Sequence, residues 1–382
     1  MNIFKFMTPE IIFGPKAMGQ VGESLLRLGA TRVFVVSDSG VQDARWVSKA
    51  LRFLEEVGLT FVIWTGITPN PKDYEVTEGA KEYLKTECDA ILAIGGGSPI
   101  DAAKAIALVA TNGGTINDYE GIDKVSSPLP PMVAVPSTAG TGAEVSQFSI
   151  IVDSKNKVKM TIISKSLIPD IAIIDPVILT TKEKMLTAST GMDALSHAVE
   201  AYVSLAATPL TDIHALSAIE LIGKHLRSSV SSNQNLKAKR EMAMASLKAG
   251  LAFSNAILGA VHAMTHPLGG ELDLPHGEAN AILLPYVMEY NLPSCIDRYM
   301  LISVALGENI NGISKRNAAL KAVDAVRSLS RDILIPENLS EMGLKKEVIP
   351  YLSQCAVKDS CLITNPRKAS AEDIEKIYYQ AF

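Results

Sequence analysis

Hydrophobic residues follow two different patterns along the chain, and the change falls near residue 180. Before it, short runs rich in Val, Ile and Phe alternate with segments in which apolar residues recur every three to four positions. Such runs are typical of strands and such segments of amphipathic helices, and their alternation predicts a parallel sheet covered by helices. The expected strands are 32–37, 59–64, 89–94, 132–135, 147–152, 158–163 and 171–174, and the expected helices are 17–28, 41–57, 72–87 and 101–110.

The second half of the chain predicts helices throughout. From about Thr180 onward, long segments rich in Ala, Leu, Met and Glu are separated by prolines, which is typical of a helical domain. A chain of 382 residues is long enough for two hydrophobic cores. We therefore expect an α/β domain with a Rossmann-like parallel sheet over residues 1–180 and an all-α domain over residues 181–382.

The net charge and the cysteine pattern limit the kinds of partner and the cellular compartment to be expected for this protein. Lys and Arg total 36 against 41 Asp and Glu, for a formal net charge of -5, so nucleic acid and anionic membranes are not expected partners. No apolar stretch approaches the length of about 18 residues that a membrane span needs, and residues 1–6 lack a charged leader followed by an apolar core. The four cysteines form no CxxC pair, which favours reduced thiols and a cytoplasmic location.

A glycine-rich turn in the first half is a candidate phosphate site. Gly95, Gly96 and Gly97 follow an expected strand and precede an expected helix. Backbone N–H groups at such a turn can approach an anion, and the helix N-terminus adds partial positive charge, so the turn could hold a pyrophosphate. The spacing fits neither GxGxxG nor a Walker A loop, and this motif alone is equally compatible with a simple tight turn.

Two further strand ends strengthen the prediction of a dinucleotide site. Asp38 follows the strand 32–37, where a carboxylate can bind the hydroxyls of an adenosine ribose and repel a 2'-phosphate, although an Asp there can also simply cap the next helix. The segment 136–142, PSTAGTG, offers hydroxyls and glycines after another strand. Three such ends along one edge of a parallel sheet favour a nucleotide site over three unrelated turns.

Acidic and histidine side chains in the second half form a candidate metal site. Asp193 and His197 are four positions apart in an expected helix and so share one face. His262 and His266 repeat this spacing, and His276 follows ten positions later. A carboxylate with several imidazoles suits Fe(II), Zn(II), Co(II) or Ni(II) without choosing among them. No HExxH motif is present, so spacing alone leaves open which histidines bind the metal.

The remaining histidines and the basic residues also bear on the site. His214 and His225 lie in a helical run and are expected to be structural. No Lys or Arg occurs between Lys248 and Arg298, nor within 186–203. Because an anionic substrate usually meets a cation in its pocket, we expect a small uncharged substrate.

Six segments together resemble the group III, iron-dependent alcohol dehydrogenases, in order and over nearly the whole chain. The resemblance implies a two-domain, dehydroquinate synthase-like fold, bound NAD, and Fe(2+) or another divalent metal such as Zn(2+). It also implies a homodimer or a larger homo-oligomer. The segments are GGGSPIDAAKAIA (95–107), PSTAGTGAEVS (136–146), GMDALSHAVEAY (191–202), VHAMTHPLGG (261–270), PHGEANAILLPYVMEYN (275–291) and NPRKASAEDIEKIYYQAF (365–382).

By the same resemblance, roles are implied for individual residues. The metal ligands are implied to be Asp193, His197, His262 and His276. His266 corresponds to the histidine near the nicotinamide to which a positioning or proton-relay role is assigned. The NAD contacts are implied to be Asp38, Asn70, Gly96, Gly97, Ser98, Thr138, Thr141, Lys159 and Leu179.

The expected reaction is hydride transfer between NAD(H) and small uncharged primary alcohols or diols and their aldehydes. The main alternative is a dehydroquinate synthase-like lyase, in which a Glu replaces the aspartate ligand and the pocket is rich in Lys and Arg. Glycerol dehydrogenase and a reductase of acidic substrates are alternatives among the oxidoreductases. A metal-dependent hydrolase with an incidental glycine loop is a further alternative, distinguished by whether absorbance at 340 nm changes with NADH and an aldehyde. A binding protein without catalysis would leave the clustered ligands unexplained.

Overall fold

The computed structural model describes residues 5–382, and these residues form two compact units. The α/β unit consists of Met7–Thr138 and Gly142–Thr181. The helical unit consists of Lys182–Phe382, the short segment Ala139–Thr141 and the described residues up to Phe6. The segment Ala139–Thr141 therefore packs with the helical unit although it lies within the first half of the sequence.

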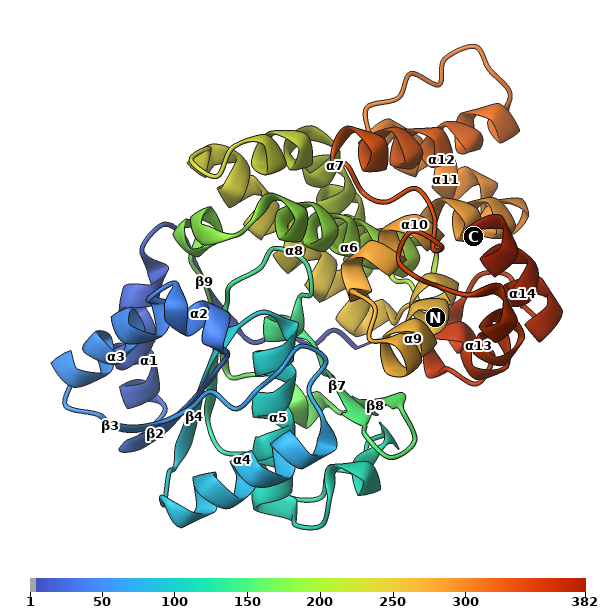
Figure 1. The fold of residues 1–382 in the computed structure, drawn as a ribbon. Helices are drawn as coiled ribbons and strands as arrows, with labels where there is room; N and C mark the ends of the chain where they lie inside the picture. The colour runs from blue at the N-terminus through green and yellow to red at the C-terminus, as the bar shows by residue number, and fades with distance from the viewer. Residues whose placement is uncertain (1–4) are drawn as a thin grey trace. The chain divides into compact units, whose positions relative to one another are not determined.

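The α/β unit is built on a six-stranded sheet in which every pair of neighbouring strands is parallel. Figure 1 shows helices on both faces of this sheet, so the predicted architecture of a parallel sheet covered by helices is confirmed. In spatial order the strands are β1 (Glu10–Phe13), β9 (Ile171–Ile174), β6 (Met132–Pro136), β4 (Ala90–Gly95), β2 (Arg32–Ser37) and β3 (Thr60–Trp64), and the covering helices are α1 (Val21–Arg27), α3 (Trp46–Glu56), α4 (Asp73–Lys85) and α5 (Gly97–Asn112).

Alternate side chains of the central strands fill two separate cores, as the two-residue period of a strand requires. On β2, Val33 and Val35 pack with α1 and α3 on one face. Phe34 and Val36 pack with α4 and α5 on the other. Because both faces of the sheet are covered, the strands are almost continuously apolar, which is why their positions were readable from the sequence.

Three features of the α/β unit differ from the expectation. The strand β1 was not expected, and it is a four-residue strand at the edge of the sheet. The expected helix 41–57 is interrupted at Arg45, which has a left-handed φ of 63° and separates α2 (Ser39–Asp43) from α3. The strands β7 (Phe148–Asp153) and β8 (Val158–Ile163) form an antiparallel hairpin in a second, three-stranded sheet with β5 (Gly121–Ile122), because their short connection is too brief for a parallel crossover.

The helical unit contains no strand among its described residues, which confirms the predicted all-α region. The long helices α6, α7 and α8 pack side by side. No single helix within residues 5–382 is long and apolar enough to cross a membrane, and only α8 and α9 together meet that test, as a pair bent by 100°. The helices are α6 (Lys184–Val203), α7 (Pro209–Ser231), α8 (Leu236–Ala256), α9 (Ala260–Leu272), α10 (His276–Asn291), α11 (Ile296–Ala305), α12 (Lys315–Asp332), α13 (Ile349–Ala356) and α14 (Ala371–Gln380).

Candidate functional site

The carboxyl ends of β2, β4 and β6 lie next to one another in the sheet. Ser37 at the end of β2 pairs with Ile94 of β4, and Gly95 pairs with Pro136 at the end of β6. Asp38 therefore directly follows a strand end at this edge. Its Oδ1 accepts a hydrogen bond of 2.8 Å from the Val41 backbone N–H and caps helix α2, so the capping role considered for Asp38 is present in the structure.

The glycine-rich turn lies at the same edge and leads into helix α5. Gly96 is the N-cap of α5, and Gly97 and Ser98 are its first two residues. Beside this turn, Ser137 Oγ and Thr138 Oγ1 are buried and have no hydrogen-bond partner within residues 5–382. Buried hydroxyls are seldom left unpaired. Together with the α5 N-terminus, they form a set of donors that suits the phosphate groups of a dinucleotide.

The other expected cofactor residues lie in several parts of the chain. Asn70, in a left-handed conformation, precedes Pro71, whose carbonyl accepts a hydrogen bond of 2.8 Å from Val152 N–H. Val152 is paired with Lys159 across the β7–β8 hairpin, so the Asn70 loop lies beside the hairpin that carries Lys159. Leu179 is buried in the 3-10 helix Pro176–Thr181. Thr141 belongs to the segment that packs with the helical unit.

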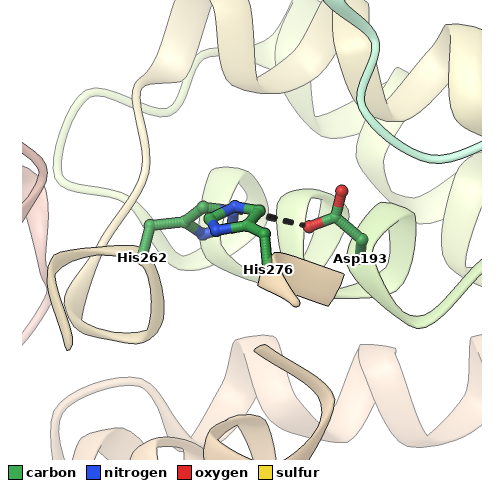
Figure 2. A group of neighbouring side chains, drawn as sticks. All are labelled: Asp193, His262 and His276. Carbon is green, nitrogen blue, oxygen red and sulfur yellow. Dashed lines mark ion pairs between the residues drawn. The ribbon is translucent and has the colours of Figure 1, made fainter. Parts of the chain in front are cut away.

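The four residues expected to bind a metal converge around one carboxylate oxygen in the helical unit. The Nε2 atoms of His197 and His262 are each 3.8 Å from Asp193 Oδ1, and that of His276 is 3.9 Å away. Figure 2 shows the rings of His262 and His276 beside the Asp193 carboxylate. Ligands of a tetrahedral metal ion with bonds of about 2.1 Å are about 3.4 Å apart. Donor atoms of Asp193, His262 and His276 all lie within 4.8 Å of one another, which approaches the spacing of such a site, and His197 Nε2 lies beside Asp193 at the edge of this group.

Hydrogen bonds at the opposite ring nitrogens orient two of these imidazoles. His197 Nδ1 lies 3.1 Å from the Gly140 carbonyl oxygen, and His262 Nδ1 lies 2.6 Å from Glu200 Oε2. Both partners only accept hydrogen bonds, so Nδ1 carries the proton in each case. This assignment leaves Nε2 directed toward Asp193, and once Nε2 has given up any proton, its lone pair is available for a metal ion.

The charge states of the cluster follow from burial and from close neighbours. Burial lowers the pKa of His197 to about 4. Burial acts on the pKa of His262 in the same direction, but the carboxylates of Glu200 and Asp193 together outweigh it and raise this pKa to about 9. Burial also opposes the Asp193 carboxylate, yet the surrounding imidazoles outweigh this effect and hold the pKa of Asp193 well below its usual range. Asp193 is therefore an anionic donor throughout the physiological pH range.

Two glycines allow the helices that carry the histidines to approach α6. A Cβ atom on Gly259, which precedes α9, would lie 2.9 Å from Glu200 Oε1. A Cβ atom on Gly277, next to His276, would lie 2.6 Å from the Ser189 carbonyl oxygen. Both distances are too short for a side chain, so glycine at these positions lets His262 and His276 come within reach of Asp193.

Exposure differs among the donors. The side chain of His276 is 28% exposed, whereas that of Asp193 is 4% exposed. The site is therefore buried on one side and accessible on the side of His276. Catalytic metal sites keep such an open position for substrate, whereas structural sites are closed.

Glu200 is a residue of the site that the sequence analysis did not single out. Besides its contact with His262, its Oε1 accepts a hydrogen bond of 2.6 Å from Val261 N–H, and its side chain is buried. Metal-binding histidines commonly donate their second ring nitrogen to a carboxylate in this way. The spacing of Asp193, His197 and Glu200 along one helix face was a usable signal, because positions i, i+4 and i+7 share a face.

His266 lies next to the metal cluster without belonging to the converging donors. Its ring stacks on that of His276, with centroids 5.7 Å apart. Its Nδ1 lies 2.7 Å from Asp359 Oδ2, and the charge of His266 helps to lower the pKa of Asp359 despite burial. Asp359 was also missed by the sequence analysis. The two histidines expected to be structural, His214 and His225, are half-buried and lie outside the donor group.

The observed donors fit a divalent transition metal. One ionised carboxylate and three imidazoles converge from α6, α9 and α10, and two of the imidazoles have a fixed tautomer. Carboxylate and imidazole together suit iron and zinc equally well. The donor chemistry alone does not distinguish between them.

Comparison with protein families assigns the chain to a class. Residues 8–176 match iron-containing alcohol dehydrogenase, and residues 187–382 match the C-terminal part of the Fe-containing alcohol dehydrogenase family. The chain belongs to the iron-containing alcohol dehydrogenase family and is an oxidoreductase of that family, as the resemblance of its motifs predicted. This membership favours an oxidoreductase over the lyase alternative.

Individual relatives match along nearly their whole length. The 1,3-propanediol dehydrogenase of Klebsiella pneumoniae is 44% identical over 384 residues, which cover 100% of this chain and 99% of that protein. The NAD-dependent methanol dehydrogenase of Bacillus methanolicus is 40% identical over 98% of this chain and 99% of that protein. The crystal structure of a 1,3-propanediol oxidoreductase is similar with a TM-score of 0.98 at 44% identity, over 100% of both chains. This similarity confirms the predicted fold class.

Proposed function

We propose that this chain is an NAD(H)-dependent, metal-dependent alcohol dehydrogenase that interconverts small uncharged primary alcohols or diols and their aldehydes. The observation that carries the proposal is the convergence of three imidazole Nε2 atoms on Asp193 Oδ1. The metal ligands are Asp193, His197, His262 and His276. Iron is the metal that the family name favours, and zinc is the main alternative.

A divalent metal bound there supplies Lewis acidity, which lowers the pKa of a bound hydroxyl group. The ligands that the protein provides determine how much of the positive charge of the metal ion remains to lower that pKa. One carboxylate and three neutral imidazoles would offset only one of the two charges of a dication held there, and would so preserve its Lewis acidity. Glu200 holds the ring of His262 with Nε2 facing Asp193, and the Gly140 carbonyl does the same for His197.

His266 is the residue we assign to proton transfer. Its Nδ1 is bonded to Asp359, so its Nε2 is the ring atom left to exchange a proton. Asp359 also accepts a hydrogen bond of 2.8 Å from Cys361 N–H through its other oxygen. The carboxylate is therefore fixed in place, and it holds the ring of His266 in one orientation.

Three observations support NAD as the hydride acceptor. The buried hydroxyls of Ser137 and Thr138 lack partners within residues 5–382 and lie beside the N-terminus of α5. Asp38 stands at a strand end of the same edge, where a carboxylate suits the ribose of NAD and disfavours NADP. A relative 40% identical to this chain is named as NAD-dependent. The full set of proposed contacts is Asp38, Asn70, Gly96, Gly97, Ser98, Thr138, Thr141, Lys159 and Leu179.

A short diol such as 1,3-propanediol is our first choice of substrate. A relative 44% identical over the whole chain is named for that diol, and the two long stretches without Lys or Arg surround the proposed ligands. Phe253 stacks on the ring of His197, with centroids 4.4 Å apart, and provides an apolar surface beside the donors. An uncharged carbon chain fits such surroundings better than an anion does.

The experiment that tests this function is a substrate panel with defined metals. The protein is stripped of metal, reconstituted anaerobically with Fe(II) or Zn(II), and assayed at 340 nm with NAD and alcohols or diols of two to six carbons. We expect metal-dependent turnover that is greatest for short diols and absent from the stripped protein. Absence of turnover with every alcohol and both metals would contradict the proposal.

Location and assembly also belong to the proposal. We expect a cytoplasmic enzyme and a homodimer or a larger homo-oligomer. Light scattering on the purified protein tests the assembly, and a monomeric mass would contradict it.

A further inference from the structure

The side chain of Asn280 lies at the point where the proposed metal ligands converge. Asn280 is one helical turn beyond His276 on α10, and it is fully buried. Its Nδ2 is 2.7 Å from Asp193 Oδ1, 3.1 Å from His262 Nε2 and 3.2 Å from His276 Nε2. Three of the four proposed ligand atoms are therefore within hydrogen-bond distance of a single amide nitrogen.

The contact with Asp193 determines what this amide does. A carboxylate only accepts hydrogen bonds, so the amide N–H is the donor to Asp193 Oδ1. That same oxygen is the one on which the three imidazole Nε2 atoms converge. Asn280 thus holds the single anionic donor by the atom that faces the other ligands, and a shift of this oxygen would disturb all their distances at once.

The second polar atom of the amide also points to a role at the metal centre. Asn280 Oδ1 is buried and has no hydrogen-bond partner in the part of the chain that the structure describes. Native proteins rarely leave such an atom unpaired, and where they do, a water molecule or an ion often completes the site. Packing alone would favour an apolar residue of similar shape, such as leucine, over an asparagine whose carbonyl is unpaired.

We propose that Asn280 is a positioning residue of the metal centre, which fixes the Asp193 carboxylate for the cation and keeps the donor set at a single negative charge. This inference rests on the metal centre of the proposed function. The neutrality of the amide is part of the role. A dication bound by one carboxylate has a net charge near +1. An aspartate of the same shape in place of Asn280 would add a second negative charge and bring the net charge of the site near zero. The site would then stabilise an alkoxide less strongly.

The test compares three variants in metal binding and turnover. Asn280→Leu keeps the approximate shape and removes both polar atoms, and Asn280→Asp keeps the shape and adds a charge. The matched control is Asn291→Leu, because Asn291 is equally buried on the same helix and pairs with Asn365 rather than with the proposed ligands. Co(II) affinity is measured by competition with a chromophoric chelator, the visible spectrum of bound Co(II) reports ligand geometry, and circular dichroism reports folding.

We expect Asn280→Leu to weaken Co(II) binding by roughly 10- to 100-fold and to change its spectrum, as loss of a group that orients a metal ligand does. Asn280→Asp should retain Co(II) and lose roughly 10- to 100-fold in kcat. Asn291→Leu should lower thermal stability and leave Co(II) affinity unchanged.

Wild-type Co(II) affinity and a wild-type Co(II) spectrum in a folded Asn280→Leu protein would overturn the inference. A wild-type kcat in Asn280→Asp would also overturn it. If the leucine variant does not fold, the aspartate variant is the deciding test. Failure of the wild-type protein to bind Co(II) would instead overturn the proposed metal centre. The two failures are therefore distinguishable.

Discussion

Each unit of the molecule contains a cluster of buried ionisable side chains, and the two clusters differ in how their polar atoms are paired. In the helical unit, the Nε2 atoms of three imidazoles lie 3.8–3.9 Å from one carboxylate oxygen. In the α/β unit, Lys104 is fully buried near Asp101 and Glu144, and its Nζ lies 2.6–3.1 Å from four oxygen atoms of residues 143–148. The ammonium group is thus fully paired by the protein itself.

This difference separates a binding site from a structural support. Lys104 belongs to α5, which begins with the glycine-rich turn, and it fastens the segment 143–148, which follows the hydroxyl-rich segment 136–142. The hydrogen bonds of its ammonium group hold α5 and the segment 143–148 together. The comparison teaches that buried charge alone does not indicate chemistry. Convergence of several carboxylate and imidazole donor atoms does.

The largest expected effect is the loss of a ligand. His276→Ala should abolish metal binding and lower kcat/KM by about 10,000-fold or more, because alkoxide formation then lacks its Lewis acid. NAD binding, measured by fluorescence titration of NADH, should be retained. Metal content is measured by atomic emission on protein reconstituted with Fe(II) or Zn(II). The control is His225→Ala, a half-buried histidine outside the donor group, and retention of full metal content by His276→Ala would contradict the ligand assignment.

The next effect concerns stability in the other cluster. Lys104→Met removes the cation and leaves the four oxygen atoms and the two carboxyl groups without it, so we expect a loss of about 3–5 kcal/mol in the free energy of unfolding. Urea denaturation followed by circular dichroism measures this loss. Metal affinity of the folded variant should be unchanged. A variant as stable as the wild type would show that Lys104 is not the support that its contacts indicate.

A smaller effect depends on pH. Burial raises the pKa of Glu144 to about 7, although Lys104 opposes the shift, and an unfolded glutamate has a pKa of about 4.3. The folded state then holds the proton more tightly, so Glu144 lowers stability progressively as pH rises from about 4 to 7, by at most roughly 4 kcal/mol.

Glu144→Gln removes this titration. The variant should be more stable than the wild type at about pH 8 and nearly equal to it at about pH 4, as measured by urea denaturation at both values. Asp101, whose pKa burial also raises, titrates in both proteins, so the difference between them isolates Glu144. A stability difference that does not change with pH would contradict the assignment.

The sequence predicted the parts of the molecule that are defined by local spacing. The strands β2, β8 and β9 have the expected bounds because runs of Val and Ile mark them. Asp193 and His197 were paired correctly on one helix because four positions make one turn. The break at Arg45 was not predictable, because a left-handed residue other than glycine leaves no mark in the hydrophobic pattern.

The residues that support the site act across the fold, and their separation in sequence from the histidines that they contact does not reveal them. Asp359 lies 93 positions after His266, and Glu200 lies 62 positions before His262. No periodicity joins such pairs, since helix packing alone brings them together. Spacing along a single helix was visible for Glu200 with Asp193 and for Asn280 with His276. An amide is an unusual partner for a metal centre, however, and gave no reason to select Asn280.

The smallest expected effect sharpens the comparison most directly, because it exchanges similar carboxylates in the two clusters. Glu200→Gln keeps the shape but presents a neutral amide to His262 Nδ1, so the imidazole becomes a weaker and less firmly oriented ligand. We expect metal affinity to fall by roughly 10- to 100-fold, measured by chelator competition with Zn(II). Glu144→Gln is the matched control, since it makes the same substitution at a buried glutamate of the other cluster, and it should leave Zn(II) affinity unchanged. Equal affinities for Glu200→Gln and Glu144→Gln would mean that Glu200 is only another buried support, and the distinction between the two clusters would then rest on the ligands alone.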